Sequence, residues 1–213
     1  QVLLQKGKTD LVAEIQKISS LISVSYIRQK EPLGLGHAIL VTRSLVGDEP
    51  FAVFLGDDII DSSVPCMAQM MRVFERYESA IVAVQEVARQ EVRHYGIIEG
   101  IQVSDGIFEV KDMVEKPDPE KAPSNLAIIG RYILPPQIFD LLEETKPDEG
   151  GEIQLTNALR ALGRAQRVYG YRFEGKRYDA GNKLGFLKAT VEFALKRPDL
   201  AQEFGEYLRT LKI

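Results

Sequence analysis

Apolar residues along the chain alternate between helical and strand spacing. Apolar side chains recur every three or four residues in several stretches, as on one face of an α-helix, and these stretches are separated by short continuous apolar runs typical of buried strands. Helices are expected at residues 11–22, 34–46, 67–77, 135–144, 152–162, 183–195 and 200–211. Strands are expected at residues 24–28, 51–55, 80–87, 126–134 and 167–173, with further short strands within 95–114.

This order of elements predicts an α/β fold, with a Rossmann-like mixed, mainly parallel sheet flanked by helices. The stretch 95–114 is expected to be a small β-rich insertion, and residues 183–211 to form C-terminal helices. The run 51–55 is apolar throughout, which is typical of a strand buried on both faces. Ligands bind beyond the carboxyl ends of strands in such sheets, and Asp57 and Asp58 follow this run directly.

The composition favours a single domain over residues 1–213. Hydrophobic residues make up 45% of the chain, which is enough for one sizeable core. The net charge of −4 argues against general binding to nucleic acid or to a membrane surface. Cys66 is the only cysteine, so an internal disulfide is excluded. No run of 18 apolar residues occurs, and a cytoplasmic protein is expected.

Three aspartates predict a site for a divalent cation. Asp57 and Asp58 are adjacent, and no Lys or Arg lies between Arg43 and Arg72, so the two carboxylates lack a compensating charge nearby in the sequence. Asp179 lies in a second turn that contains glycine. Mg²⁺ is often held by one or two carboxylates together with substrate phosphates. The alternatives are an ordinary strand-to-loop turn for the pair and an Asx turn capping the next helix for Asp179.

Two further segments suggest contacts with a phosphorylated ligand. Gly34 and Gly36 would let the backbone approach a flat ligand, with Gln29 as a paired donor and acceptor, or they would simply relieve a helix entry. Glu115 would accept from sugar hydroxyls and Lys116 would meet phosphate, or the two would form a surface ion pair. Adjacent side chains on a strand face opposite ways, so both can serve one ligand only if the strand ends or bulges there.

Taken together, these segments resemble the bacterial UTP–glucose-1-phosphate uridylyltransferases. The resemblance runs from about residue 5 to the end, through the stretches 28–38, 50–58, 95–97, 114–117, 130–132, 151–156 and 178–181. Members of that family begin with a strand and a G-x-G-T-R loop that holds the nucleotide phosphates, and nothing in this chain matches that loop. The chain is therefore expected to be a C-terminal portion of such an enzyme, or to lack its start.

The resemblance implies an Mg²⁺-dependent transfer from UTP to glucose 1-phosphate, giving UDP-glucose and pyrophosphate, by a homo-oligomer of two or four chains. The phosphate oxygen of the sugar would attack the α-phosphorus in line, so that no general base is needed. The implied catalytic residues are Asp57, Lys116 and Asp179, with Asp57 and Asp179 as the metal ligands. The implied substrate contacts are Gln29 and Gly34 for uracil, Gly96 and Glu115 for glucose, Lys116 for the phosphates, and Asp58, Asn125 and Glu152 along the sugar pocket.

Three alternatives stay open. The chain could be another sugar-phosphate nucleotidyltransferase that uses dTTP or ATP, because base choice rests on few contacts. It could be a glycosyltransferase with a metal-binding Asp motif, although that reading leaves Glu115 and Lys116 unexplained. It could also be a non-catalytic assembly module whose two C-terminal helices form an oligomer interface.

Overall fold

The computed structural model describes residue 7 and residues 9–211. The chain falls into two units, which divide between Lys30 and Glu31. The N-terminal unit contains helix α2 (Thr9–Ser19), in which the apolar side chains of Leu11, Ile15 and Ile18 are exposed. The predicted strand at residues 24–28 is wrong, because these residues have no regular structure. An apolar run forms a strand only where a second strand takes up its backbone hydrogen bonds, and periodicity does not report that partner.

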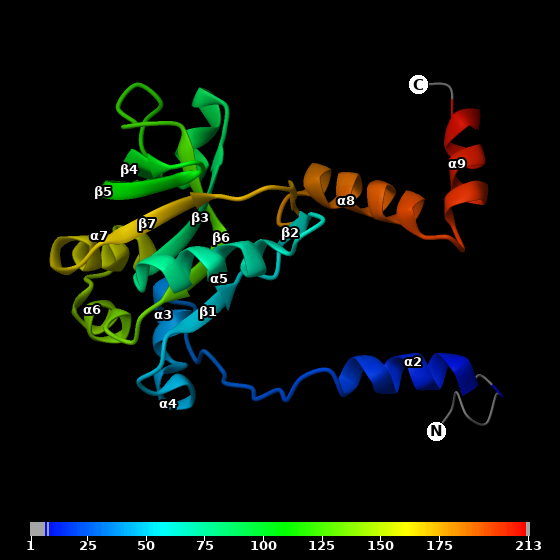
Figure 1. Cartoon of the computed structure of the whole chain (residues 1–213), viewed down its shortest axis with the longest axis horizontal. Helices are drawn as coiled ribbons and strands as arrows, with labels where there is room; N and C mark the ends of the chain where they lie inside the picture. The colour runs from blue at the N-terminus through cyan, green and yellow to red at the C-terminus, as the bar shows by residue number, and fades with distance from the viewer. Residues whose placement is uncertain (1–6, 8, 212–213) are drawn as a thin grey trace. The chain divides into compact units, whose positions relative to one another are not determined.

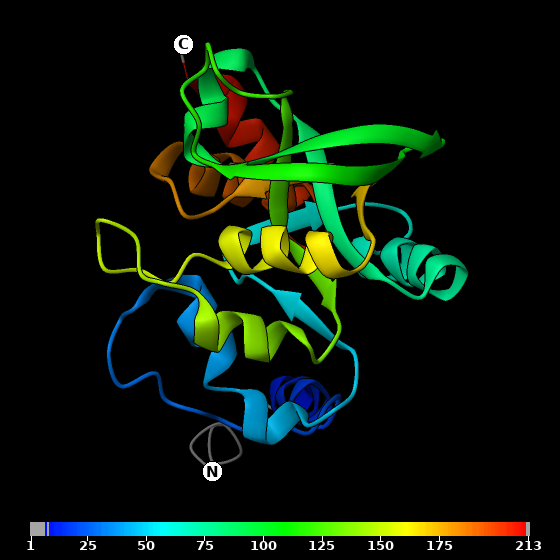
Figure 2. The ribbon, with the colours of Figure 1, turned by 90° about the vertical axis from the view of Figure 1, so that its left-hand side faces the viewer.

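The second unit is built on a six-stranded sheet (Figure 1). Its strands, in spatial order, are β1 (Phe51–Phe54), β6 (Leu126–Leu134), β3 (Ala80–Glu86), β7 (Val168–Arg172), β5 (Ile107–Glu115) and β4 (Gly96–Ser104). One face packs on α5 (Cys66–Tyr77) through Met70 and Val73. The other face packs on α3 (Gly34–Leu40), α6 (Ile138–Glu144) and α7 (Leu155–Ala165), which Figure 2 shows lying across it.

The sheet is mixed and flanked by helices, as predicted, but its strands are less parallel than expected. Within the described residues, β3 and β7 form the parallel pair and the other pairings of this sheet are antiparallel. The strands β4 and β5 are also not a separate insertion. Because β5 pairs with β7 and β4 pairs with β6, the hairpin continues the main sheet.

Strand β1 lies at an edge of the sheet, so the prediction that this run is buried on both faces is wrong. Burial alternates along it, and Phe54 is 56% exposed. The guanidinium of Arg131, from β6, lies 4.9 Å from the centre of the Phe54 ring. An edge strand has one neighbour, and the helix packing covers only one of its faces, so the apolar run here does not mean complete burial.

Several of the predicted helices have different bounds in the structure. Helix α2 ends at Ser19 instead of residue 22, and α6 begins at Ile138 instead of residue 135. The expected helix 34–46 is divided into α3 and α4 (Arg43–Val46), and α7 begins at Leu155 instead of residue 152. Ile153, before α7, instead pairs with the first turn of α3 and with Leu33, the residue before that helix. The Gly36 N–H donates to the Ile153 carbonyl at 2.9 Å, and a Cβ on Gly36 would lie 2.5 Å from that oxygen. Gly36 therefore serves close packing between two chain segments.

A second sheet, which the sequence pattern did not predict, has two antiparallel strands, β2 (Asp58–Asp61) and β8 (Lys176–Asp179). It is followed by α8 (Lys183–Lys196) and α9 (Ala201–Thr210), the predicted C-terminal helices (Figure 1). None of the helices in the described part of the chain is both long enough and apolar enough to span a membrane.

Candidate functional site

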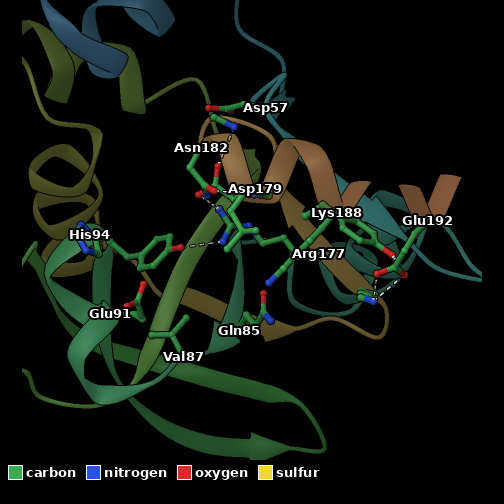
Figure 3. A pocket seen from close by; sticks show the side chains of 16 residues that line it. Asp57, Gln85, Val87, Glu91, His94, Arg177, Asp179, Asn182, Lys188 and Glu192 are labelled. Atoms are coloured by element: carbon green, nitrogen blue, oxygen red, sulfur yellow. Dashed lines mark hydrogen bonds and ion pairs between the residues drawn. The ribbon is translucent and has the colours of Figure 1, made fainter. Parts of the chain in front are cut away.

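The second sheet brings together two carboxylates from distant parts of the sequence. Asp58 pairs with Asp179 across β2 and β8, and the Asp57 carbonyl accepts from the Ala180 N–H at 2.8 Å. A Cβ placed on Gly181 would lie 2.8 Å from Asp57 Oδ2 and 3.1 Å from Asp179 Oδ1. The side chains of Asp57 and Asp179 therefore converge on one point, as the sequence predicted for a shared site (Figure 3).

Asp58 has a different environment from Asp57. Its side chain is only 7% exposed, and it forms an ion pair with Nε of Arg177. Its other carboxylate oxygen accepts from the Gly130 N–H at 2.7 Å. The prediction that both adjacent aspartates lack a compensating charge is therefore wrong for Asp58, because Arg177 reaches it from β8. The predicted contact of Asp58 with the sugar stays a prediction.

Arg177 is a largely buried cation at the centre of this arrangement, and sequence reasoning did not select it. Its Nη1 donates to the Tyr95 hydroxyl at 3.1 Å, and its Nη2 lies 3.8 Å from Asp179 Oδ2. Burial lowers the pKa of the Arg177 guanidinium, but the hydrogen bond with Tyr95 and the charge of Asp58 outweigh burial and leave that pKa raised. Arg177 follows directly on Gly175 and Lys176, and no local pattern distinguishes it from a surface arginine.

Two cavities share Asp57, Arg177 and Asp179 in their walls. The larger, of about 1000 Å³, is lined by Asp57, Arg177 and Asp179, and also by Lys188 and Glu192 of α8 (Figure 3). The smaller, of about 220 Å³, shares the first three of these residues. A ligand in either cavity would therefore lie next to the carboxylates of Asp57 and Asp179.

The smaller cavity has a wall made of β4, β5 and the start of α7. Gly96 lies opposite Glu115 in the β4–β5 register, and Thr156 Oγ1 donates to Glu115 Oε2 at 2.6 Å. A Cβ on Gly96 would lie 2.8 Å from Thr156 Oγ1, so glycine leaves room for this hydrogen bond. Gly96 and Glu115 are thus brought together as predicted. Thr156 was missed as a site residue, although it ends one of the stretches that carry the family resemblance.

Strand β5 ends at Glu115, which confirms the expected break before Lys116. The backbone of Lys116 has a φ of +45°, in the left-handed region that a non-glycine residue rarely adopts. Its N–H donates to the Tyr95 carbonyl at 2.9 Å, and its Nζ lies 3.6 Å from Glu115 Oε1. This backbone turn allows two adjacent side chains to lie on the same side, which a continuing strand would not allow.

The comparisons with known proteins agree with this geometry. A family model described as nucleotidyl transferase matches residues 2–195. The chain is 48% identical over 212 residues to UTP–glucose-1-phosphate uridylyltransferase 2 of Staphylococcus saprophyticus, covering 100% of this chain and 73% of that protein. The chain belongs to the UTP–glucose-1-phosphate uridylyltransferases. It is also 48% identical over 207 residues to the UTP–glucose-1-phosphate uridylyltransferase of Bacillus subtilis, covering 97% of this chain and 71% of that protein.

Solved uridylyltransferase structures have the same fold. One, a UDP-glucose pyrophosphorylase complexed with UDP-glucose, has a TM-score of 0.85 at 47% identity and covers 90% of this chain and 73% of that chain. Another, a UTP-bound UGPase from Acinetobacter baumannii, has a TM-score of 0.90 at 39% identity and covers 99% of this chain and 74% of that chain. The predicted fold and the predicted class, a nucleotidyl-transferring enzyme, are confirmed.

The remaining predicted contacts of this uridylyltransferase, like Lys116, do not line either of the two cavities. Gly34 adopts a φ of +87°, and a Cβ there would lie 2.8 Å from the Glu152 Cβ. The Glu152 carboxylate is exposed and accepts from the Gln154 side chain at 3.0 Å. Asn125 is exposed, and its side chain donates to the Val87 carbonyl at 3.4 Å. Gln29 belongs to the N-terminal unit. The substrate contacts of these four residues stay predictions.

Proposed function

We propose that this uridylyltransferase transfers a uridylyl group from UTP to glucose 1-phosphate, releasing pyrophosphate and forming UDP-glucose. Its membership of the family supports this reaction. The observation that carries the proposal is the convergence of Asp57 and Asp179 beside a cavity walled by Gly96 and Glu115. On this proposal, a site for a metal and phosphates would lie next to a site for a sugar.

The two converging carboxylates fit Mg²⁺. Within the described residues, no group of three or more His, Cys, Asp and Glu side chains could hold a metal ion. Mg²⁺ does not need such a cage, because it keeps several waters and is bound through one or two carboxylates plus substrate phosphates. Asp57 and Asp179 would hold it, while Asp58 is already paired with Arg177. When bound, the ion would neutralise phosphate charge during transfer.

Glu115 is suited to hold the sugar. Its Oε2 accepts from Thr156, which fixes the orientation of the carboxylate, and its Oε1 is directed towards Lys116 at 3.6 Å. A carboxylate is a strong acceptor for sugar hydroxyls. Gly96, opposite Glu115, adds no side chain to the cavity. We therefore assign the glucose to the smaller cavity, with Glu115 as its main acceptor.

Lys116 is suited to meet the phosphates. Its side chain is 54% exposed and projects from a backbone turn at the end of β5. Glucose 1-phosphate already carries an anionic oxygen, so the reaction needs positioning and charge neutralisation more than a general base. Gly34 would contact the uracil. This role is the part of the proposal that distinguishes UTP from dTTP or ATP.

We also propose that the protein is cytoplasmic and forms a homo-oligomer of two or four chains. Exposed apolar side chains on the C-terminal helices support self-association. They are Leu184, Phe186 and Leu187 of α8 and Tyr207 of α9, each more than half exposed. Monomeric proteins rarely expose several large apolar residues close together, and such patches commonly mark protein–protein interfaces.

The experiment is an assay of pyrophosphate release from glucose 1-phosphate with UTP, dTTP or ATP, in the wild-type protein and in Asp57→Ala and Asp179→Ala. We expect UTP to give the highest kcat/KM, and each substitution to reduce turnover strongly while the circular dichroism spectrum is unchanged. A higher kcat/KM with dTTP or ATP would overturn the choice of nucleotide. An unchanged Mg²⁺ dependence in either variant would remove that residue from the metal site.

A further inference from the structure

One largely buried arginine contacts three of the segments that build the site. The Arg177 side chain is 11% exposed and lies on the same face of β8 as Asp179, two residues further on. Its Nε donates to the Asp58 carboxylate, and its Nη1 donates to the Tyr95 hydroxyl at 3.1 Å. Its Nη2 lies 3.8 Å from Asp179 Oδ2. The planar guanidinium therefore bridges β2, β8 and the residue before β4.

Each partner of Arg177 either belongs to the proposed site or adjoins it in sequence. Asp179 is a proposed metal ligand, and Asp58 directly follows Asp57, the other proposed ligand. Tyr95 directly precedes Gly96 in the wall of the sugar cavity, and its ring lies 5.2 Å from the Arg177 guanidinium carbon. The spacing between metal and sugar depends on how these segments are held against one another.

We propose that Arg177 is a positioning residue that holds the two metal-binding carboxylates in register with the sugar-binding wall. This inference rests on the proposed metal role of Asp57 and Asp179. Arg177 acts through its partners: it fixes Asp179 directly, Asp57 through Asp58, and Gly96 through Tyr95. Its closer ion pair, with Asp58, neutralises that carboxylate. Asp179 Oδ2 lies further from the guanidinium, at 3.8 Å, so that Asp57 and Asp179 stay available as the pair for the cation.

Arginine is suited to this role because its five N–H donors have a fixed planar geometry. A lysine at the same position keeps the positive charge but has one compact ammonium group, which cannot reach three partners in one plane. Arg177→Lys therefore separates geometry from charge. A loss of charge alone would strengthen the attraction for a cation, whereas misplaced carboxylates would weaken metal binding.

The test is direct binding of Mn²⁺, measured from the electron paramagnetic resonance signal of the free ion, in the presence of saturating UDP-glucose. We expect Arg177→Lys to raise the Mn²⁺ dissociation constant by about 10- to 100-fold, as is typical when a residue that orients metal ligands is changed. The circular dichroism spectrum should be unchanged. An unchanged Mn²⁺ dissociation constant in the folded variant would overturn the inference.

Arg160→Lys is the matched control. Arg160, like Arg177, forms an ion pair with an aspartate: its Nε and Nη2 donate to Asp112 at 2.5 and 2.7 Å. Neither Arg160 nor Asp112 lines the two cavities that Asp57 and Asp179 line. We expect its Mn²⁺ affinity to match that of the wild-type protein. An equal loss of affinity in Arg160→Lys would mean that any lost arginine pair weakens binding, and would also overturn the inference.

Two further variants separate the possible failures. If Asp57→Ala leaves Mn²⁺ binding unchanged, the proposed metal site itself fails. If Asp57→Ala weakens binding and Arg177→Lys does not, only the positioning role fails. Should Arg177→Lys not fold, Tyr95→Phe removes a single hydroxyl partner of the guanidinium and keeps the ring. A smaller rise in the Mn²⁺ dissociation constant is then expected, and no rise would overturn the proposal.

Discussion

Gly181 offers a direct test of the metal site, because it lies between the two carboxylates. A Cβ built on Gly181 would lie 2.8 Å from Asp57 Oδ2 and 3.1 Å from Asp179 Oδ1. Gly181 is exposed and does not have a positive φ, so alanine can adopt its backbone conformation. The substitution Gly181→Ala therefore changes the space between the carboxylates with little effect on the fold.

The expected magnitude follows from these distances. An ordinary carbon–oxygen contact is about 3.3 Å, so the Asp57 carboxylate must move by roughly 0.5 Å to accept the methyl group. Metal–ligand distances tolerate deviations of only about 0.2 Å. Mg²⁺ also requires near-ideal octahedral geometry. We therefore expect the Mg²⁺ concentration for half-maximal activity to rise by about 10- to 100-fold, and a tenfold rise corresponds to about 1.4 kcal/mol.

The assay is pyrophosphate release at saturating UTP and glucose 1-phosphate over a series of Mg²⁺ concentrations. Gly56→Ala is the matched control. Gly56 directly precedes Asp57, and a Cβ there would have nothing within 4 Å. The control should have the Mg²⁺ dependence of the wild-type protein, and both variants should unfold at the same temperature.

Two results would refute the reasoning. An unchanged Mg²⁺ dependence in Gly181→Ala would mean that Asp57 and Asp179 do not bind the ion at the point where they converge. An equal shift in Gly56→Ala would mean that any added methyl group in these turns disturbs the site. In that case the effect could not be assigned to the space between the carboxylates.

Three further predictions concern Lys116 with Glu115, Thr156 and Cys66. In kinetics with glucose 1-phosphate varied at saturating UTP, Lys116→Ala should mainly lower kcat. Glu115→Gln should raise KM by about 5- to 30-fold, which corresponds to about 1–2 kcal/mol. Unchanged parameters in Lys116→Ala would leave only a surface ion pair. Thr156→Val removes the donor to Glu115 and should raise the same KM by about 3- to 10-fold with kcat retained, whereas an unchanged KM would show that Glu115 needs no such support. Burial raises the pKa of the Cys66 thiol from its ordinary 9.0 to about 11, so the unfolded chain releases this proton first and stability falls as pH rises through this range. Urea unfolding at pH 8 and pH 10 should show a smaller decline in Cys66→Ala, and an equal decline would contradict this assignment.

Several elements follow directly from the sequence because their signals are local. The apolar run 126–134 predicts β6 with the bounds that the structure has, and the helical spacing in residues 67–77 predicts α5 to within one residue. These segments are buried against the centre of the sheet or against its face, where apolar pattern and burial agree. The proline after Lys116 likewise predicts the end of β5 at Glu115.

Other features depend on contacts between distant segments, which periodicity does not report. The run 51–55 has the composition of a fully buried strand, yet β1 lies at the edge of the sheet and exposes Phe54. The stretch 95–114 contains strands, as predicted, but only their pairing with β6 and β7 shows that they extend the main sheet.

The sequence by itself determined the residue types of the site: carboxylates after strands, an acid and a base before a proline, and the stretches shared with the uridylyltransferases. The tertiary structure decided which of these side chains meet. Asp57 converges with Asp179 only because β2 pairs with β8. Asp58 instead forms an ion pair with Arg177, which lies far from it in the chain. Hydrogen bonds and charges act over a few ångströms in space, whereas sequence patterns describe neighbours along the chain, so the division of roles among three similar aspartates arises only on folding.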